Sequence, residues 1–283
     1  MEIKSLATTS FDELFEAFES AFADYEVQLN KVELQAMLKR RGFNPKLSFA
    51  AFDEGKIVSF TCNGIGNYNG IPTAYDTGTG TLKDYRGKGL ATQVFEYSIP
   101  YLKEAGIKEY LLEVLQHNTG AVSVYRKIGF EVTREFNYFG LENNSVRSKS
   151  KAIDFPHTLQ PVNINEYNSI PGFWDFSPSW QNSCESIERA HETFICLGAF
   201  TDGKLIGYGI FDPVSGDVTQ LAVDKEYRRK GIGSILFQKM LEMNEYNSIK
   251  IVNTDTQCES ITTFLKAYDI LPTGQQFEMI KRL

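Results

Sequence analysis

The sequence is poor in residues that cross-link or hold metal in small proteins. It has 4 cysteines and 3 histidines in 283 residues, with no Cys-x-x-Cys pair and no two histidines close together. A zinc cage or a disulfide framework needs such spacings. We therefore expect reduced core thiols and no bound metal.

Long hydrophobic runs are missing as well. No stretch approaches the run of about 18 apolar residues that a membrane-spanning helix needs. Residues 1–18 carry acidic side chains where a secretion signal has an apolar run. We expect a cytoplasmic protein that binds no membrane.

Positive charge is not in excess either. The sum of 29 Lys and Arg against 36 Asp and Glu gives a net charge of −7, whereas a surface that coats nucleic acid needs a basic face. We expect no nucleic-acid partner and a better fit to a cationic or amine partner. With 42% hydrophobic residues the chain can bury a core, and its length allows two domains.

What the sequence does contain is one order of elements, met twice. In the first half Ser10 and Glu13 have the spacing of a capping box, Gly129 is placed to close a helix, and Pro100 should kink or shorten one. Strands are expected over 1–6, 47–52, 57–62, 71–82, 109–115 and 130–139, and helices over 10–25, 31–39, from 90 onward and over 118–128. The second half repeats the order, with strands over 194–200, 205–211, 217–223 and 249–253 and helices from 232 onward and over 260–268.

A polar stretch over 141–158 shows no apolar periodicity and separates the two halves. We therefore expect an N-terminal domain over 1–141, a linker over 142–157 and a C-terminal domain over 158–283.

The clearest repeat is a basic, glycine-spaced octapeptide, "DYRGKGLA" at 84–91 and "EYRRKGIG" at 226–233. Each copy joins a strand to a helix, where unpaired N–H groups and the helix dipole favour an anion. Gly89 and Gly231 allow a close approach to the backbone, and the neighbouring Arg and Lys residues add charge. This combination predicts a diphosphate site.

Two common diphosphate loops do not fit. A Walker A loop needs Gly-Lys-Ser/Thr, but Lys88 and Lys230 are each followed by glycine. A dinucleotide loop needs Gly-x-Gly-x-x-Gly opening a parallel βαβ unit, whereas these copies have two glycines and follow apparent hairpins.

The octapeptide resembles the acetyl-CoA loop of the GCN5-related N-acetyltransferases. The similarity extends to "HNTGAVSVYRKIGF" at 117–130, with its Asn, small residue and Tyr-x-x-x-Gly-Phe ending. The resemblance implies an α/β fold of the α+β type: two units, each a mixed, mostly antiparallel sheet flanked by helices. It also implies that the fourth and fifth strands splay apart, with Gly78 and Gly80 permitting a bulge.

The resemblance implies acetyl-CoA as co-substrate. The residues expected to bind it are Thr81, Leu82, Arg86, Gly87, Lys88, Gly89, Leu90, Ala91 and Asn118 in the first half, and Ala222, Val223, Arg228, Arg229, Lys230, Gly231, Ile232 and Gly233 in the second.

Tyr125 matches the tyrosine that many family members use to protonate the leaving thiolate, although a core-packed helix tyrosine is the alternative. The base is open between Asp76 and Glu113, with His117 a further candidate. Either acid can also lie on the other face of its strand. Direct transfer to an amine needs no covalent enzyme intermediate, so the lack of a nucleophile triad is consistent with it.

The second half departs from the family pattern. Aligning Phe264 with Tyr125 leaves no acid and replaces the Gly-Phe turn by Asp269 and Ile270. The aromatic stretch over 169–190 is either domain core or a recognition surface. The first domain is therefore the expected catalytic one.

The function expected from the resemblance is transfer of an acetyl group from acetyl-CoA to the primary amine of a small molecule or peptide. The rival is a CoA-binding sensor or regulatory module with little or no turnover.

Overall fold

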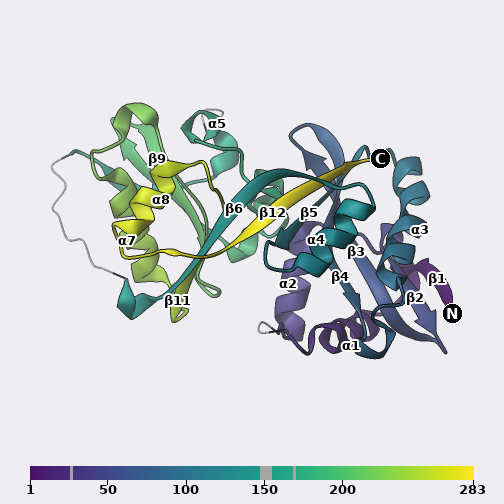
Figure 1. Cartoon of the computed structure of the whole chain (residues 1–283). Helices are drawn as coiled ribbons and strands as arrows, with labels where there is room; N and C mark the ends of the chain where they lie inside the picture. The colour runs from purple at the N-terminus through teal and green to yellow at the C-terminus, as the bar shows by residue number, and fades with distance from the viewer. Residues whose placement is uncertain (26–27, 147–154, 168–169) are drawn as a thin grey trace. The chain divides into compact units, whose positions relative to one another are not determined.

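The protein is described by a computed structural model that covers residues 1–25, 28–146, 155–167 and 170–283 (Figure 1). Its residues form two compact units. Unit 1 contains Met1–Thr133, Glu188–Ala190 and Phe277–Leu283, and unit 2 contains Arg134–Ile187 and His191–Gln276.

These units differ in two strands from the ranges 1–141 and 158–283, which stay a prediction. Strand β6 (Glu131–Glu142) begins in unit 1 and continues in unit 2, and β12 (Pro272–Arg282) begins in unit 2 and ends in unit 1. Part of the expected linker, 147–154, lies outside the described residues.

Unit 1 has the strand order β1-β2-β3-β4-β5-β12. Neighbours are antiparallel from β1 to β4, and β4 pairs with β5 in parallel. The elements are β1 (Glu2–Ser5), α1 (Phe11–Phe22), α2 (Lys31–Arg41), β2 (Phe49–Asp53), β3 (Lys56–Tyr68), β4 (Ile71–Thr81), α3 (Leu90–Glu104), β5 (Glu109–Leu115) and α4 (Thr119–Lys127).

The sheet of unit 1 is covered by helices on both faces because its strands alternate between two cores. Phe60 and Cys62 pack against α1 and α2, whereas Phe49 and Val58 pack against α3. A third cluster joins α3, α4 and β5 around Tyr110.

Local signals in unit 1 act as the sequence predicts. Ser10 and Glu13 form both hydrogen bonds of a capping box at the start of α1. The helix α3, however, continues past Pro100 to Glu104, so of the two effects expected of this proline, a kink or an early end, the early end does not occur. The glycine-spaced octapeptide at 84–91 therefore leads into a helix of 15 residues.

Unit 2 has the strand order β6-β11-β10-β9-β8-β7. Its elements are β7 (Thr158–Pro161), α5 (Ile170–Phe173), α6 (Cys184–Arg189), β8 (Ile195–Thr201), β9 (Lys204–Asp212), β10 (Asp217–Val223), α7 (Ile232–Met243), β11 (Ser248–Asp255) and α8 (Glu259–Lys266).

Short 3-10 turns in the two units occupy Leu6–Thr8, Pro45–Leu47, Lys83–Tyr85, Asn143–Ser145, Ile164–Glu166, Trp180–Asn182, His191–Thr193 and Lys225–Tyr227.

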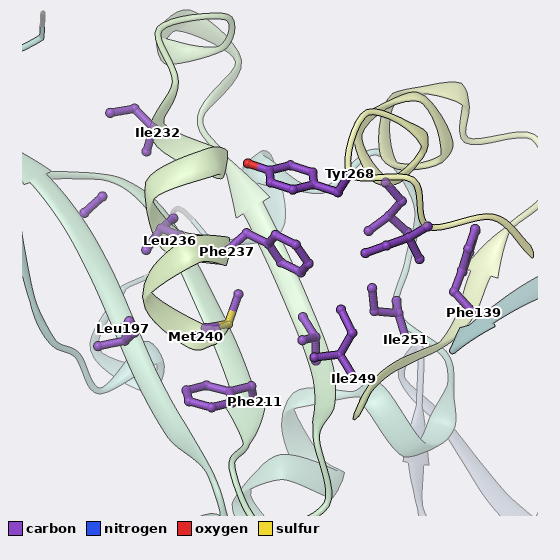
Figure 2. Packing of buried hydrophobic residues seen from close by; sticks show 14 of the residues in the cluster. Phe139, Leu197, Phe211, Ile232, Leu236, Phe237, Met240, Ile249, Ile251 and Tyr268 are labelled. Atoms are coloured by element: carbon purple, nitrogen blue, oxygen red, sulfur yellow. The ribbon is translucent and has the colours of Figure 1, made fainter. Parts of the chain in front are cut away.

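The core of unit 2 lies between α7, α8 and the sheet (Figure 2). Phe237 of α7 packs edge-on against Tyr268, with ring centroids 4.9 Å apart. Ile249 and Ile251 of β11 belong to the same cluster. An aromatic cluster around Phe173 and Tyr208 covers the opposite face of the sheet, so much of the aromatic stretch is domain core.

The last strand was absent from the expectations, yet it completes unit 1. Met279 of β12 is fully buried with Tyr110 and Leu112, and the Leu283 N–H donates to the Lys108 carbonyl at 2.8 Å. Unit 1 is therefore closed by residues from the end of the sequence.

Both units have the mixed, mostly antiparallel sheet flanked by helices that the sequence predicts. None of the helices in the described part of the chain combines the length and the apolar content that a membrane crossing needs.

Candidate functional site

The loop of unit 1 leads into α3 with its backbone exposed. Gly87 and Gly89 have φ values of 75° and 74°, a left-handed conformation that glycine adopts without strain. Gly89 caps α3 without a side-chain hydrogen bond, so no side chain covers the first-turn N–H groups. This is the geometry of an anion site at a helix N-terminus.

The side chain of Arg86 does not face that anion site. Its guanidinium donates to the carbonyls of Ala21 at 2.9 Å and Thr81 at 3.2 Å, and to Asp24 Oδ2 at 3.1 Å. Arg86 therefore anchors the loop to the end of α1, which leaves the backbone N–H groups and Lys88 as the candidates for holding an anion.

Unit 2 repeats the arrangement at its own loop. Arg228 donates to both carboxylate oxygens of Asp175, at 2.9 and 3.0 Å, and to the Phe173 carbonyl. Gly231 has a φ of 88°, and Arg229 takes the left-handed conformation of Gly87 with a φ of 65°. The two loops share one backbone conformation despite their different sequences.

The splay expected between the fourth and fifth strands is present. Strand β4 pairs with β5 only over Thr73–Tyr75, and β10 pairs with β11 only at Asp217. A bulge lies in β4 between Asp76 and Gly78, where the sequence suggested one. Thr81 and Leu82 then follow in β4 and its exit, next to the loop.

Tyr125 and Asp76 meet at this opening. The Tyr125 hydroxyl lies 3.4 Å from Asp76 Oδ2, which also accepts a hydrogen bond from Thr79 Oγ1 at 2.8 Å. Asp76 Oδ1 is buried and has no hydrogen-bond partner among the described residues. The sequence named the first two residues but not Thr79, whose spacing of three from Asp76 was the available signal.

Burial sets the protonation of this pair. Desolvation raises the pKa of Asp76 to about 6, against the smaller lowering effects of hydrogen bonds from Thr79 and Tyr125. Desolvation and the nearby Asp76 raise the pKa of Tyr125 well above 10. At neutral pH Asp76 is therefore mostly ionised and Tyr125 keeps its proton.

The other candidates occupy different positions. Glu113 Oε2 accepts a hydrogen bond from the buried Tyr75 hydroxyl at 3.0 Å, so its carboxylate is engaged on β5. His117 is exposed to solvent. Asn118 caps α4 by accepting a hydrogen bond from the Ala121 N–H at 3.2 Å.

Backbone hydrogen bonds at the ends of α4 and α8 identify which residues of unit 2 are equivalent to those of unit 1. The Phe130 N–H donates to the Tyr125 carbonyl, and the Ile270 N–H donates to the Leu265 carbonyl in the same way. Leu265, not Phe264, therefore stands where Tyr125 does, and the alignment made from the sequence is wrong by one residue.

The turn thought to be lost in unit 2 is retained. Asp269 has a φ of 63°, the same left-handed conformation that Gly129 adopts with a φ of 92°. Asp tolerates this region better than most residues do, because its short polar side chain finds local hydrogen bonds. The backbone of α8 and its turn is therefore retained, and the change is in the side chain, with Leu265 where unit 1 has Tyr125.

Unit 2 replaces all three candidate proton-transfer groups. The bulge of β10 lies between Val218 and Gln220, which puts Val218 at the position of Asp76. The Asn118 N–H donates to the Leu115 carbonyl before α4, and the Cys258 N–H donates to the Asp255 carbonyl before α8. Glu113 and Asn253 each lie two residues before the accepting residue, so Asn253 is equivalent to Glu113. Among these equivalent positions, the candidate proton-transfer groups therefore occur in unit 1 and not in unit 2.

Unit 2 nevertheless contains a cavity of about 840 Å³ at its splay. Its walls include the loop residues Gly231, Ile232, Gly233 and Ser234, the strand residues Val218, Gln220, Ala222 and Val223, and Asn182, Trp174, Leu265 and Tyr268. The volume is within the range of about 300–1,000 Å³ typical of ligand pockets.

No group of three His, Cys, Asp or Glu side chains in the described ranges is arranged to hold a metal ion.

Comparison with known proteins gives the chain its relatives. The sequence model of the Acetyltransferase (GNAT) family matches residues 11–130 and 162–257. N-alpha-acetyltransferase MAK3 of Arabidopsis thaliana is 31% identical over 96 residues, which cover 34% of this chain and 50% of the relative. Mycothiol acetyltransferase of Thermobifida fusca is 31% identical over 121 residues, covering 40% and 38%.

The chain thus spans about half the length of the first of these curated relatives and less of the second. A solved structure of a tandem GNAT protein from the clavulanic acid biosynthesis pathway aligns with a TM-score of 0.74 at 15% identity. The alignment covers 99% of this chain and 98% of that one. It shows a shared tandem fold.

Proposed function

Because the chain belongs to the Acetyltransferase (GNAT) family, we propose that it transfers an acetyl group from acetyl-CoA to a primary amine at the Tyr125–Asp76 pair of unit 1. The observation that carries the proposal is this half-buried acid–base pair at the strand splay, next to a loop shaped for a diphosphate. Acetyl-CoA supplies a thioester whose carbonyl carbon accepts the amine and whose thiol leaves.

The loop of unit 1 suits the CoA diphosphate. The N–H groups at the start of α3 and the positive end of its dipole face the same region as the glycines of the loop. Lys88 lies 4.7 Å from the Tyr85 ring centroid, in the same loop, and adds positive charge there. Backbone groups after Tyr75 on β4 face the splay, where they suit the amides of an extended arm.

The pair can carry both proton transfers. The neutral amine attacks, the C–N bond forms and the C–S bond breaks, while Tyr125 gives its proton to sulfur. Asp76 accepts the proton that the acylated nitrogen loses, directly or through water, and passes it to the Tyr125 phenolate through their contact. Both groups then have their starting protonation.

The acceptor is a small-molecule or peptide amine. The Asp76 and Glu113 carboxylates on neighbouring strands favour a cationic group, as does the net charge of −7. The name of one relative, an N-alpha-acetyltransferase, supports an amine acceptor, and the name of the other, a mycothiol acetyltransferase, supports a small-molecule acceptor.

A thiol-release assay with acetyl-CoA against polyamines, aminoglycosides, amino acids and peptides tests the proposal. Gly89→Glu adds a side chain and a negative charge at the loop of unit 1, so it should abolish turnover. The matched Gly231→Glu variant should keep most of it. If Gly231→Glu is inactive and Gly89→Glu active, unit 2 is the catalytic one.

The second candidate function is a CoA-binding module without turnover. It is favoured by the apolar Val218 and Leu265 of unit 2, but Tyr125 and Asp76 argue against it for unit 1. Binding of acetyl-CoA with no thiol released by any amine of the panel would support this alternative.

A further inference from the structure

The bulge of β4 presents the Asp76 carboxylate with one of its oxygens out of reach of any donor. Oδ2 accepts from Thr79 Oγ1 at 2.8 Å and lies 3.4 Å from the Tyr125 hydroxyl. Oδ1 is buried and has no hydrogen-bond partner within the described part of the chain. Ionising such a carboxyl group is costly, so any positive charge near it has a large effect on its protonation.

That positive charge comes from the end of α2. Arg41 Nη1 donates to the Thr77 carbonyl at 3.1 Å, and the guanidinium carbon lies 5.9 Å from the centroid of the buried Tyr75 ring. Tyr75 and Thr77 are the residues directly before and after Asp76. The charge of Arg41 lowers the pKa of Asp76, against the larger raising effect of burial. Arg41 therefore contacts the chain on both sides of this carboxylate.

The contact with Thr77 has a reason in the strand pairing. Cys62 of β3 pairs with Gly78 and Asn63 pairs with Asp76, so Thr77 is the extra residue of the bulge. Such a residue is left out of the hydrogen-bond ladder. Arg41 supplies a donor for the carbonyl of this residue, and so it holds the bulge in the conformation that presents Asp76.

The backbone brings Arg41 to the bulge before its side chain makes any contact. Arg41 is the last residue of α2, which ends at Gly42 with a φ of 79°. The Ile65 N–H of β3 donates to the Gly42 carbonyl at 2.9 Å. A Cβ on Gly64 would lie 2.0 Å from the Arg41 carbonyl oxygen, so the close approach of α2 to β3 requires glycine there.

The other titratable groups around Asp76 provide no positive charge. Burial, and to a smaller extent the Asp76 charge, raises the pKa of each of Cys62 on β3, Tyr75 on β4, Tyr110 on β5 and Tyr125 on α4. Glu113 on β5 is an acid and accepts from the Tyr75 hydroxyl. Arg41 is thus the cation in the immediate surroundings of the candidate base.

We propose that Arg41 is a positioning residue for Asp76, which fixes the bulge of β4 and supplies the charge that compensates the carboxylate. It acts through Asp76 and not on the reacting atoms. The role of Asp76 as the base rests on the acetyl transfer proposed for unit 1, whereas the pairing of Arg41 with Asp76 does not.

A double-mutant cycle in the full chain tests the pairing without any substrate. Arg41→Gln keeps a donor for the Thr77 carbonyl and removes the charge, and Asp76→Asn removes the charge of its partner. At pH 7.5, Arg41→Gln should lower the denaturation midpoint of unit 1 more in the wild type than in the Asp76→Asn background. At pH 4 the folded carboxyl group is protonated, since its pKa is about 6, so the two effects should add.

Two further variants separate the charge from other effects. Lys39→Gln removes an equal charge from the last turn of α2 at an exposed position, and its effect should add to that of Asp76→Asn at both pH values. Arg41→Lys keeps the charge and should keep most of the coupling at pH 7.5. If Arg41→Gln alone does not fold at pH 7.5, rescue of folding by added Asp76→Asn reports the same coupling, and a lack of rescue contradicts it.

Kinetics give a second readout once an amine acceptor is known. Without the charge of Arg41 the pKa of Asp76 should rise further, so the ratio of kcat/KM between the wild type and Arg41→Gln should be largest below pH 6 and fall towards one as the pH rises. A side chain that only packs would lower kcat/KM by the same factor at every pH. KM for acetyl-CoA should stay unchanged.

Four results overturn the proposal: additive effects of Arg41→Gln and Asp76→Asn at pH 7.5, coupling of the same size at pH 4, Arg41→Lys behaving as Arg41→Gln, or a kcat/KM ratio that does not change with pH. A failure of every amine to accept an acetyl group would contradict the proposed function instead, and the stability cycle would still decide the role of Arg41.

Discussion

The Tyr125 hydroxyl lies 3.4 Å from Asp76 Oδ2, and the equivalent positions of the second unit hold Leu265 and Val218. The contact joins α4 to β4 at the point where β4 leaves β5. The same tertiary position thus holds a hydroxyl–carboxylate contact in one unit and hydrocarbon in the other. This difference is the basis for assigning different roles to the units.

Replacing Tyr125 by Phe should remove the acid and little else, because the ring keeps its contact with Phe130. We expect kcat to fall by about 10²–10⁴-fold with little change in KM for acetyl-CoA. Tyr101→Phe on α3, an exposed tyrosine, is the control and should be unchanged. An unaltered kcat for Tyr125→Phe would mean that this tyrosine only packs.

The pH dependence of kcat/KM should report Asp76. Its pKa of about 6 means that the ratio of kcat/KM between the wild type and Asp76→Asn rises with pH up to about 6 and then levels off, since the base acts when deprotonated. Thr79→Val removes a hydrogen bond that lowers this pKa, so the rise should move to higher pH. The ionisation of the amine is common to all variants and cancels in the comparison.

Asp76→Asn is the decisive variant in these profiles. It should lower activity and abolish the rise near pH 6. A rise that persists in Asp76→Asn would assign the base to another group, with Glu113 the first to examine.

The ionised Asp76 side chain should also lower the free energy of unfolding at neutral pH. Its folded pKa of about 6 exceeds the ordinary value of 3.8, so the folded state binds the proton more tightly and stability falls as pH rises from about 4 to about 6. The shift corresponds to at most about 3 kcal/mol. Asp76→Asn should therefore raise the denaturation midpoint of unit 1 at pH 7.5 and change it little at pH 4.

An exposed carboxylate serves as the control for this stability effect. Asp84→Asn lies in the loop region at the surface and should shift the midpoint at neither pH. Equal stabilisation by Asp76→Asn at both pH values would show that charge burial is not the cause.

Asp24→Asn tests the role of the Arg86 side chain. The pair is exposed, so its loss should loosen the loop modestly and raise KM for acetyl-CoA by up to about fivefold, with kcat nearly constant. Asp12→Asn, at the start of α1 and paired with Lys31, is the matched control. A lower KM in Asp24→Asn would mean that the freed guanidinium binds the diphosphate itself.

Most of the helices and strands were predicted correctly from local sequence patterns. The capping box of Ser10 and Glu13, the helix end at Gly129 and the strand over 109–115 all depend on neighbouring residues, and all are confirmed. Such elements are determined by turn chemistry and periodicity within one segment.

The parts that sequence reasoning missed depend on distant partners. In strand β12 and just after it, the apolar residues Phe277, Met279 and Leu283 are an even number of positions apart, as on one face of a strand. That Met279 is buried in the core of unit 1 can be seen only in the structure, because its neighbours come from the first half of the chain. Arg86 forms its ion pair with Asp24, which is distant in the sequence. The spacing of the motif alone instead suggested that the Arg86 side chain binds a phosphate group. Leu265 was misaligned because the second copy has a different spacing between its loop and its last helix.

The assignment of residues 277–283 to the first unit has a consequence for how this chain reaches its native state. Residues 1–133 by themselves lack Met279 and the hydrogen bond from Leu283 to Lys108, so their core stays open until the far end of the sequence arrives. Contacts of such long sequence separation slow folding, because the closure entropy comes before the gain. A fragment cut at 141 would expose Tyr110 and Leu112, and unit 1 is in this sense a product of both ends of the sequence.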